Sequence, residues 1–301
     1  MSEQSQTFRS FQDKWEQNQT LAFEQTLREG ADIFNWILTR NGFPSVDNFS
    51  AWLSGRRRIL DAGCGNGRVT ALLDRYAPAT ARIVGIDLAA AHVARQNLAG
   101  NPRTEFHEGD LLGDLQGLGR FDLIYCQEVL HHTLDPKRAF LNLTTLLEDG
   151  GEIAIYVYKK KAPLREFADD MIRDAISPMA YEQAIEEMKQ ITELGRVLSE
   201  LKLKVQIPEV RLLDIEAGEY DLQRFIYNFF LKCFWNPELS EEENFAINYD
   251  WYHPQLCSRH TRDEVEEWFK EAGLEILHSL VDPYGITVRG RRGATSDAPD
   301  A

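Results

Sequence analysis

Three glycines alternate in the segment ILDAGCGNGRVT, at Gly63, Gly65 and Gly67, between an apolar run and a helix-like run. Glycines at such spacing let a nucleotide-like ligand approach the backbone closely. The dinucleotide fingerprint G-x-G-x-x-G needs its third glycine one place later, where this chain has Arg68. Asp61, just before the loop, would also repel a bound pyrophosphate. The loop therefore indicates a nucleotide-like ligand other than NAD or a flavin.

Two further acids stand at the ends of the next predicted strands. Asp87 ends the strand in IVGIDLA, and Asp110 follows the strand in TEFHEGDLL. S-adenosylmethionine offers hydrogen-bond donors that suit all three acids: its ammonium suits Asp61, its ribose hydroxyls suit Asp87 and its adenine amino group suits Asp110. A single strand-end aspartate is more often a turn or helix cap. Three of them on successive strands favour S-adenosylmethionine.

The elements that must position these acids are short Val-, Ile- and Leu-rich runs that alternate with helix-like runs from residue 58 to residue 158. This alternation predicts an α/β fold with a parallel sheet and helices on both of its faces. Because the carboxyl ends of parallel strands meet at one edge, the acids should lie on the same side of the sheet. The capping box Thr261-x-x-Glu264 then opens a helix, and LEILHSLV and YGITVRG follow as a closing strand pair.

Helical patterns lie on both sides of the alternating region. Leu164, Phe167 and Met171 have the spacing of an amphipathic helix and indicate an inserted helical cap. We therefore divide the chain into an N-terminal helical segment at 1–57, an α/β core at 58–158, a helical cap at 159–250, a C-terminal completion of the core at 251–290 and a disordered tail at 291–301.

Four motifs in this order, DAGCGNG (61–67), GID (85–87), GDL (109–111) and EVLHH (128–132), resemble the class I S-adenosylmethionine-dependent methyltransferases. The resemblance implies a Rossmann-like sheet of seven strands whose last strand is antiparallel. It also implies the residues that contact the methyl donor: Asp61, Gly63, Cys64, Gly65, Asp87, Leu88, Asp110, Leu111 and Gln127. The stretch FQDKW is similar to the N-terminal segment of some small-molecule members, which implies that residues 1–57 cover the cofactor and that Trp15 contacts it.

Two adjacent histidines are the candidates for a base. Methyl transfer from a sulfonium is an in-line displacement, in which the protein aligns the acceptor and a base takes its proton. His131 and His132 follow the fourth strand, on the side where such sheets bind ligands, and we prefer His131. The alternative is that both histidines only pack or cap the loop before Asp135-Pro136.

A second cluster, NYDWYHP at residues 248–254, mixes aromatic side chains with an acid and a histidine. We interpret it as a loop that contacts the methyl acceptor, facing the same cleft as Tyr156 and Tyr158 at the end of the fifth strand. The candidate acceptor residues are Tyr156, Tyr249, Asp250, Tyr252 and His253. The alternative is that these aromatic rings pin the cap to the core. The spacing His253-x3-Cys257-x2-His260 offers three metal ligands without a fourth, so we predict no metal site.

The composition limits the partners. Over 301 residues the net charge is −15, whereas nucleic-acid binding needs a dense basic surface, and we expect the basic clusters at 56–58, 159–161 and 289–292 to be solvated surface charge. No apolar run approaches the ~18 residues of a membrane span, and the N-terminus lacks the order of a signal peptide, so we expect a cytoplasmic protein without membrane or nucleic-acid partners. Four scattered cysteines indicate free thiols.

These observations predict an S-adenosylmethionine-dependent methyltransferase that modifies a small molecule, at oxygen in preference to nitrogen or carbon. The alternatives are a tRNA or protein methyltransferase and, in another class, an S-adenosylmethionine-binding protein that transfers no methyl group. An NAD-dependent oxidoreductase conflicts with Arg68 and Asp61. The identity of the acceptor and the oligomeric state stay open.

Overall fold

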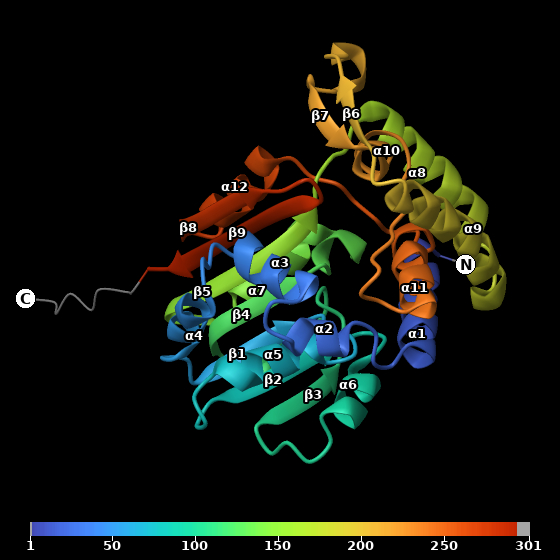
Figure 1. The fold of residues 1–301 in the computed structure, drawn as a ribbon. Helices are drawn as coiled ribbons and strands as arrows, with labels where there is room; N and C mark the ends of the chain where they lie inside the picture. Colours follow the sequence, from blue (N-terminus) through green and yellow to red (C-terminus); the bar gives the residue numbers. More distant parts are fainter. Residues whose placement is uncertain (1, 294–301) are drawn as a thin grey trace, which may run out of the picture. The chain divides into compact units, whose positions relative to one another are not determined.

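The strands predicted from residue 58 to residue 158 pair with the two C-terminal strands in one seven-stranded sheet (Figure 1). The computed structural model describes residues 2–293. The sheet order is β3-β2-β1-β4-β5-β9-β8, with β1 at Arg58–Ala62, β2 at Arg82–Asp87, β3 at Thr104–Glu108, β4 at Phe121–Gln127, β5 at Leu147–Tyr158, β8 at Leu274–Val281 and β9 at Gly285–Arg292. β1 to β5 are parallel and β9 is antiparallel to both of its neighbours, so the predicted Rossmann-like α/β fold is confirmed.

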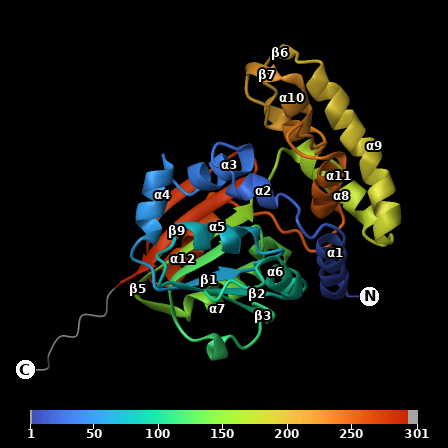
Figure 2. The same ribbon diagram turned by 60° about the horizontal axis from the view of Figure 1, so that its bottom comes forward.

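Successive side chains of a strand point to opposite faces, so each strand contributes to two separate cores. Ile59 of β1 joins the core beneath helices α3, α4 and α5, which Figure 2 shows over one face of the sheet. Leu60 joins the core beneath α7 and α12 on the other face. The helices that cover the sheet are α2 (Phe23–Leu27), α3 (Asp32–Arg40), α4 (Val46–Leu53), α5 (Arg68–Tyr76), α6 (Ala91–Asn97), α7 (Pro136–Thr144) and α12 (Arg262–Glu271), with 3-10 turns η1 (Gln116–Leu118) and η2 (Leu130–His132).

Contacts divide the chain into two compact units. The core unit contains residues 22–159 and the residues from 258 onward, which include the whole sheet. The cap unit contains the residues up to 21 and residues 160–257. This division differs from the sequence-based boundaries, because the first helix groups with the inserted helices and the insertion continues past residue 250.

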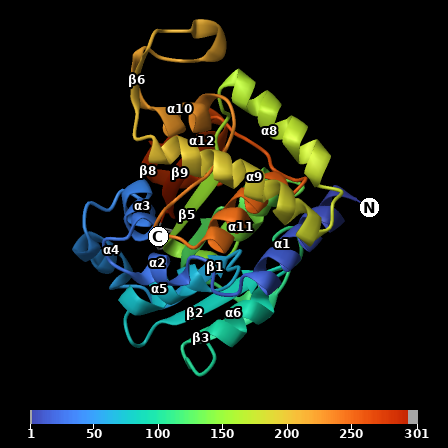
Figure 3. The ribbon, with the colours of Figure 1, turned by 45° about the vertical axis from the view of Figure 1, so that its right-hand side comes forward.

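The cap unit is mostly helical, as predicted, but it also contains a β-hairpin that the sequence analysis missed. Its helices are α1 (Glu3–Gln17), α8 (Pro163–Ile176), α9 (Tyr181–Glu200), α10 (Leu222–Phe229) and α11 (Glu241–Tyr252). Its hairpin pairs β6 (Lys204–Ile207) with β7 (Gly218–Asp221) around the 3-10 turn η3 (Arg211–Leu213). The four-residue hairpin strands are partly exposed and carry no apolar run, which explains why they gave no strand signal. Figure 3 shows α9 alongside α11.

Two local predictions need correction. The segment 248–254 is no loop, since α11 continues through Tyr252. The tail predicted from residue 291 does not begin there, because β9 extends to Arg292, and the remainder of that prediction, residues 294–301, lies outside the described part of the chain.

Two of the basic clusters contribute to interior ion pairs, which corrects the expectation of solvated charge. Glu152 on β5 is 4% exposed and lies 3.0 Å from Arg56 and 2.8 Å from Arg291. The indole of Trp52 also donates to Glu152, at 2.7 Å. Burial raises the pKa of Glu152, but these hydrogen bonds and the charge of Arg56 outweigh it and lower the pKa overall. None of the described helices is long and apolar enough to cross a membrane.

Candidate active site

The residues predicted to bind a ligand stand where the parallel strands end. Asp61 is the second-last residue of β1, Asp87 is the last residue of β2 and Gln127 is the last residue of β4. Asp110 follows two residues after the end of β3. Since these strands are parallel, all four residues share the carboxyl edge of the sheet, where open α/β sheets bind ligands.

The glycine loop between β1 and α5 is held against the segment that follows β4. Gly63, Gly65 and Gly67 have positive φ values of 82°, 52° and 85°. A Cβ at Gly63 would lie 2.2 Å from a methyl group of Val129. No side chain fits at this position, so the glycine lets the first loop and the end of β4 close on one another.

Asp87 connects the loops after β1 and β2. Its Oδ2 accepts a hydrogen bond from the amide of Gly65 at 2.9 Å, and its Oδ1 accepts from the amides of Ala89 and Ala90 at 2.8 Å each. The capping role considered as an alternative is therefore present. Because a carboxylate oxygen accepts more than one hydrogen bond, Oδ2 keeps capacity for a ligand hydroxyl.

Asp61 is a buried carboxyl group, with 2% of its surface exposed. Its Oδ2 accepts from the Thr70 hydroxyl of α5 at 2.6 Å. Burial raises the pKa of Asp61 to about 7, although the Thr70 hydrogen bond and the charge of Arg68 act in the opposite direction. The ionised form is thus poorly compensated, and a cation bound beside Asp61 would stabilise it.

The residues after β4 are unusual in partners and in backbone conformation. Gln127 is 8% exposed, and neither atom of its side-chain amide has a hydrogen-bond partner among residues 2–293. Glu128 has a φ of 61°, which residues other than glycine rarely adopt. Its carboxylate lies 3.3 Å from Arg68, the residue that replaces the third glycine of a dinucleotide loop. Backbone strain and buried polar groups without partners are typical of functional sites.

The residues predicted near the adenine differ in exposure. Leu88 is 36% exposed, so its side chain is available to a ligand, whereas Leu111 is 5% exposed and packs in the core beneath α7. Asp110 accepts from the amide of Leu112 at 2.9 Å in a local turn. Cys64 is buried against Phe106, and burial raises the pKa of its thiol.

The two candidate bases lie in η2, directly after β4. His131 is fully buried, and its ring stacks on Tyr158 of β5 with 3.7 Å between the ring centroids. Its backbone carbonyl accepts from the amide of Ser258 at 2.8 Å. His132 is partly buried, with its ring centroid 4.3 Å from that of His131. These contacts give His131 a packing role, and its role as a base stays a prediction.

Comparison with known proteins identifies the family. A family described as a methyltransferase domain matches residues 37–279, which is more than half of the chain. The chain belongs to the class I S-adenosylmethionine-dependent methyltransferases. The match includes β1 to β5, most of β8 and the inserted helices α8 to α11, and it ends before β9.

Individual relatives of this methyltransferase are distant. An uncharacterised protein of Synechococcus sp. is 30% identical over 256 residues, which cover 81% of this chain and 53% of that protein. Juvenile hormone acid O-methyltransferase of Bombyx mori is 39% identical over 108 residues, or 34% of this chain and 38% of that enzyme. The chain thus spans about half or less of these two relatives. Among solved structures, magnesium protoporphyrin IX methyltransferase of Synechocystis is similar with a TM-score of 0.45 and 14% identity, over 93% of this chain and 94% of that one.

The carboxyl edge of this methyltransferase fits the family's methyl donor. The donor's ammonium group would supply the cation that buried Asp61 lacks. The donor's ribose hydroxyls can donate to Asp87, whose Oδ2 can accept a further hydrogen bond. The unpartnered side-chain amide of Gln127 can hydrogen-bond to the methionyl group of the donor. A pyrophosphate would meet the carboxyl group of Asp61 instead, so the site disfavours a dinucleotide.

The other predicted site residues, Trp15, Tyr249, Asp250, Tyr252 and His253, belong to the cap unit. Lys14 of α1 pairs with Asp250 at 2.9 Å and lies 4.0 Å from the Trp15 ring. The His253 ring stacks on Tyr249 and hydrogen-bonds to Ser10 and Met179 at 2.9 and 3.1 Å, and burial lowers the pKa of His253. These contacts fasten α1 to the inserted helices, and contact with donor or acceptor stays a prediction.

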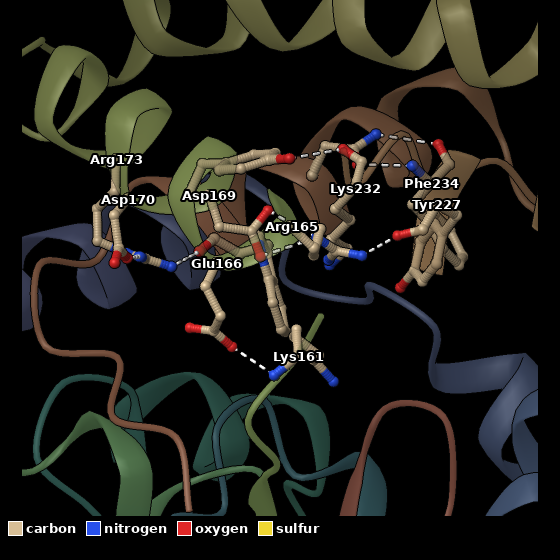
Figure 4. Close-up of polar contacts among 12 residues, drawn as sticks. Lys161, Arg165, Glu166, Asp169, Asp170, Arg173, Tyr227, Lys232 and Phe234 are labelled. Carbon is tan, nitrogen blue, oxygen red and sulfur yellow. Dashed lines mark hydrogen bonds and ion pairs between the residues drawn. The ribbon is translucent and has the colours of Figure 1, made fainter. Parts of the chain in front are cut away.

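Tyr252 lies next to a buried ion pair that joins three cap helices. Arg165 of α8 is 1% exposed and lies 2.8 Å from Asp169, one turn along the same helix. Figure 4 shows the Arg165 guanidinium reaching the backbone carbonyl of Tyr227 on α10. The Tyr252 hydroxyl of α11 donates to the carbonyl of Lys232 at 2.9 Å. The aromatic and charged residues of this region therefore build the cap's interior.

Sequence reasoning missed two polar residues of the core unit. Thr70 gives Asp61 its hydrogen bond, yet its position in α5 reads as an ordinary helix residue. Arg40 reads as a basic residue in the last turn of α3, a common surface feature, although it is 1% exposed. The sequence around Thr70 and Arg40 does not distinguish them from helix residues that have no role in a site. Within residues 2–293 no group of three or more His, Cys, Asp or Glu side chains is arranged to hold a metal ion.

Proposed function

We propose that this protein transfers a methyl group from S-adenosylmethionine to a small-molecule acceptor, with oxygen preferred over nitrogen or carbon as the methylated atom. The observation that carries the proposal is the buried, poorly compensated carboxyl group of Asp61 at the glycine loop. A positively charged ligand group beside it relieves that deficit, which distinguishes this donor from phosphate-bearing cofactors.

The bound donor supplies a methyl group already activated by its sulfonium. Asp61 holds the ammonium, Asp87 holds the ribose and Asp110 holds the adenine amino group. Gly63 and Gly65 allow the close approach of the donor to the loop backbone. The protein's remaining task is to align the acceptor and exclude water.

A hydroxyl acceptor must also lose its proton during transfer. His131 or His132, at the carboxyl end of β4, accepts that proton in the proposed mechanism. The partly buried His132 has the easier exchange of a proton with solvent, whereas His131 has the stacked, better fixed ring. Tyr156, two residues before the end of β5, lies on the strand next to β4 and is the predicted acceptor residue that belongs to the core unit.

A small acceptor is supported by the named relatives and by charge. The relative from Bombyx mori and a 27% identical relative from Coxiella burnetii, named ubiquinone biosynthesis O-methyltransferase, carry names that refer to small molecules. The net charge of −15 disfavours RNA as the acceptor, because binding of nucleic acid needs a dense basic surface.

The test is transfer of label from methyl-labelled S-adenosylmethionine to three pools: small-molecule extract, bulk tRNA and bulk protein. We expect label in the small-molecule pool with the wild-type protein, and at least tenfold less with Asp87→Ala. Label in RNA or protein alone would replace the proposed acceptor class. Donor binding without label in any pool would replace transfer with a sensing or scaffolding role.

A further inference from the structure

One buried arginine of the core unit lacks the partners that the other buried arginines have. Arg40, the last residue of α3, is 1% exposed, and the only polar partner of its guanidinium among residues 2–293 is the nearby hydroxyl of Tyr125. By contrast, Arg165 pairs with Asp169. A guanidinium carries five N–H donors and stays charged at every physiological pH, so this one is incompletely satisfied by the protein.

Aromatic rings form the surroundings of the Arg40 guanidinium. Its central carbon lies 3.7 Å from the ring centroid of Trp36 and 4.6 Å from that of Tyr156. The two rings meet edge to face, 5.5 Å apart. Ring faces attract a cation but accept no strong hydrogen bond, so they leave most N–H donors of the guanidinium unsatisfied.

The position of Arg40 is fixed by contacts on either side. The carbonyl of Arg40 accepts from His278 of β8 at 3.0 Å. The indole of Trp36 donates to Asp282 in the turn between β8 and β9 at 3.0 Å, and Asn41 donates to the hydroxyl of Tyr125 at 2.9 Å. A fixed backbone and stacked rings hold the guanidinium in one place, as recognition of an anion requires.

Arg40 also stands at the carboxyl edge of the sheet. Its neighbour Tyr156 is the register partner of Gln127, so Arg40 and Gln127, whose hydrogen-bonding groups are incompletely satisfied, are both next to the ends of β4 and β5. The donor residues Asp61 and Asp87 lie on β1 and β2, on the other side of β4 in the strand order. An anion held by Arg40 therefore lies beyond the donor, on the acceptor side.

We propose that Arg40, between Trp36 and Tyr156, binds a carboxylate group carried by the methyl acceptor. The inference rests on the proposed function and names the acceptor class as organic acids. A planar carboxylate matches the guanidinium fork with two parallel hydrogen bonds, and the rings of Trp36 and Tyr156 close the sides of the site. The carboxylate anchors the acceptor, and the methylated atom lies elsewhere on it.

The test compares Arg40→Met with Arg289→Met, in the full-length protein saturated with S-adenosylhomocysteine. Arg289 is a matched control, because its guanidinium also lies against aromatic rings, 4.5 Å from Phe43 and 5.4 Å from Trp52, but not against Tyr156. The probes are two acid and amide pairs, benzoate with benzamide and salicylate with salicylamide, titrated by calorimetry. We expect the wild type and Arg289→Met to prefer at least one acid over its amide at least tenfold.

In Arg40→Met that preference should disappear while the affinity for S-adenosylhomocysteine changes less than threefold. Arg40→Lys, which keeps the charge without the planar fork, should retain a reduced preference, and it serves as the comparison if Arg40→Met does not fold. An absent preference in the wild type, or one that survives in Arg40→Met, overturns the proposal. A tenfold loss of S-adenosylhomocysteine affinity in Arg40→Met also overturns it, because Arg40 would then pair with the carboxylate of the donor.

Discussion

At the scale of single residues, the ligand site is where this protein departs from the rules of stable packing. Asp61 is buried with one strong hydrogen bond and no full counter-charge, Gln127 has an unpartnered amide and Glu128 has a positive φ. Each feature costs folding free energy, and each lies at the carboxyl edge. The arrangement indicates that a bound ligand recovers the free energy that these features cost the folded protein.

The first prediction concerns the pH dependence of stability. The pKa of Asp61 is about 7 in the folded protein, against 3.8 for an ordinary aspartate, so the folded state binds an additional proton between these values. The contribution of Asp61 to the free energy of unfolding therefore falls as pH rises from about 4 to about 7. Asp61→Asn removes this pH-dependent loss of unfolding free energy, which is at most about 4 kcal/mol.

Thermal unfolding of the ligand-free protein tests this directly. Asp61→Asn should unfold at a higher temperature than the wild type at pH 8, with the difference shrinking toward pH 4. The same variant should bind S-adenosylhomocysteine at least tenfold more weakly, whereas the exposed control Asp114→Asn should change neither quantity. A lower unfolding temperature for Asp61→Asn at pH 8 would show that Asp61 is a stabilising residue and contradict its assignment.

The second prediction separates the two histidines. Substituting the base should lower kcat about 100-fold, in line with the usual contribution of proton transfer, and leave binding of S-adenosylhomocysteine unchanged. His131→Gln and His132→Gln are measured separately, each over a pH range. A loss of pH dependence in one variant identifies the base, and full turnover in both variants removes the idea of a histidine base.

At the scale of elements, the glycine loop and the end of β4 form one packed unit. Gly63 and Gly100 have similar φ values, 82° and 87°, but a Cβ at Gly63 would meet Val129 whereas a Cβ at Gly100 meets nothing within 4 Å. The pair separates the backbone cost of a side chain from the packing cost.

The third prediction uses this pair. Gly100→Ala should lose about 1–2 kcal/mol of unfolding free energy, which is the cost of a left-handed backbone for alanine. Gly63→Ala should lose more and should no longer bind S-adenosylhomocysteine, because the loop must move away from Val129. Denaturant unfolding and calorimetry give both quantities. Equal effects in the two variants would mean that the contact between Gly63 and Val129 does not shape the site.

The fourth prediction concerns the cap unit. Arg165→Met leaves Asp169 as a buried charge without its ion-pair partner, which should lower the unfolding free energy by about 3–5 kcal/mol. The partly exposed Arg196, which pairs with the exposed Glu193 and Glu200, is the matched control, and its substitution should have no measurable effect. If Arg165→Met unfolds like the wild type, this ion pair does not hold the cap helices together.

At the scale of the whole molecule, the sequence predicted what depends on local pattern. The β1 to β5 alternation, the capping box at Thr261 and the acids at the strand ends are local signals, and the structure contains all of them. The family match over residues 37–279 supports the same interpretation. These features can be recognised in the sequence because strand-forming runs and turn residues have conformational propensities of their own.

What the sequence did not predict depends on contacts between distant residues. Arg40 and Glu152 are charged residues that are buried by neighbours far away in the chain. The sequence on either side of them therefore does not reveal their burial. The segment at residues 248–254 looked like an aromatic loop because its pattern has no helical period, although it continues α11. α1 groups with an insertion that begins about 140 residues later, which only the folded chain shows.

The central claim is that the carboxyl edge binds the methyl donor, and a calorimetric titration of the wild-type protein tests it most directly. S-adenosylhomocysteine is titrated first and NAD is titrated in parallel. We predict saturable binding of S-adenosylhomocysteine in the micromolar range, and no heat of binding with NAD. Binding of NAD without binding of S-adenosylhomocysteine would contradict the claim.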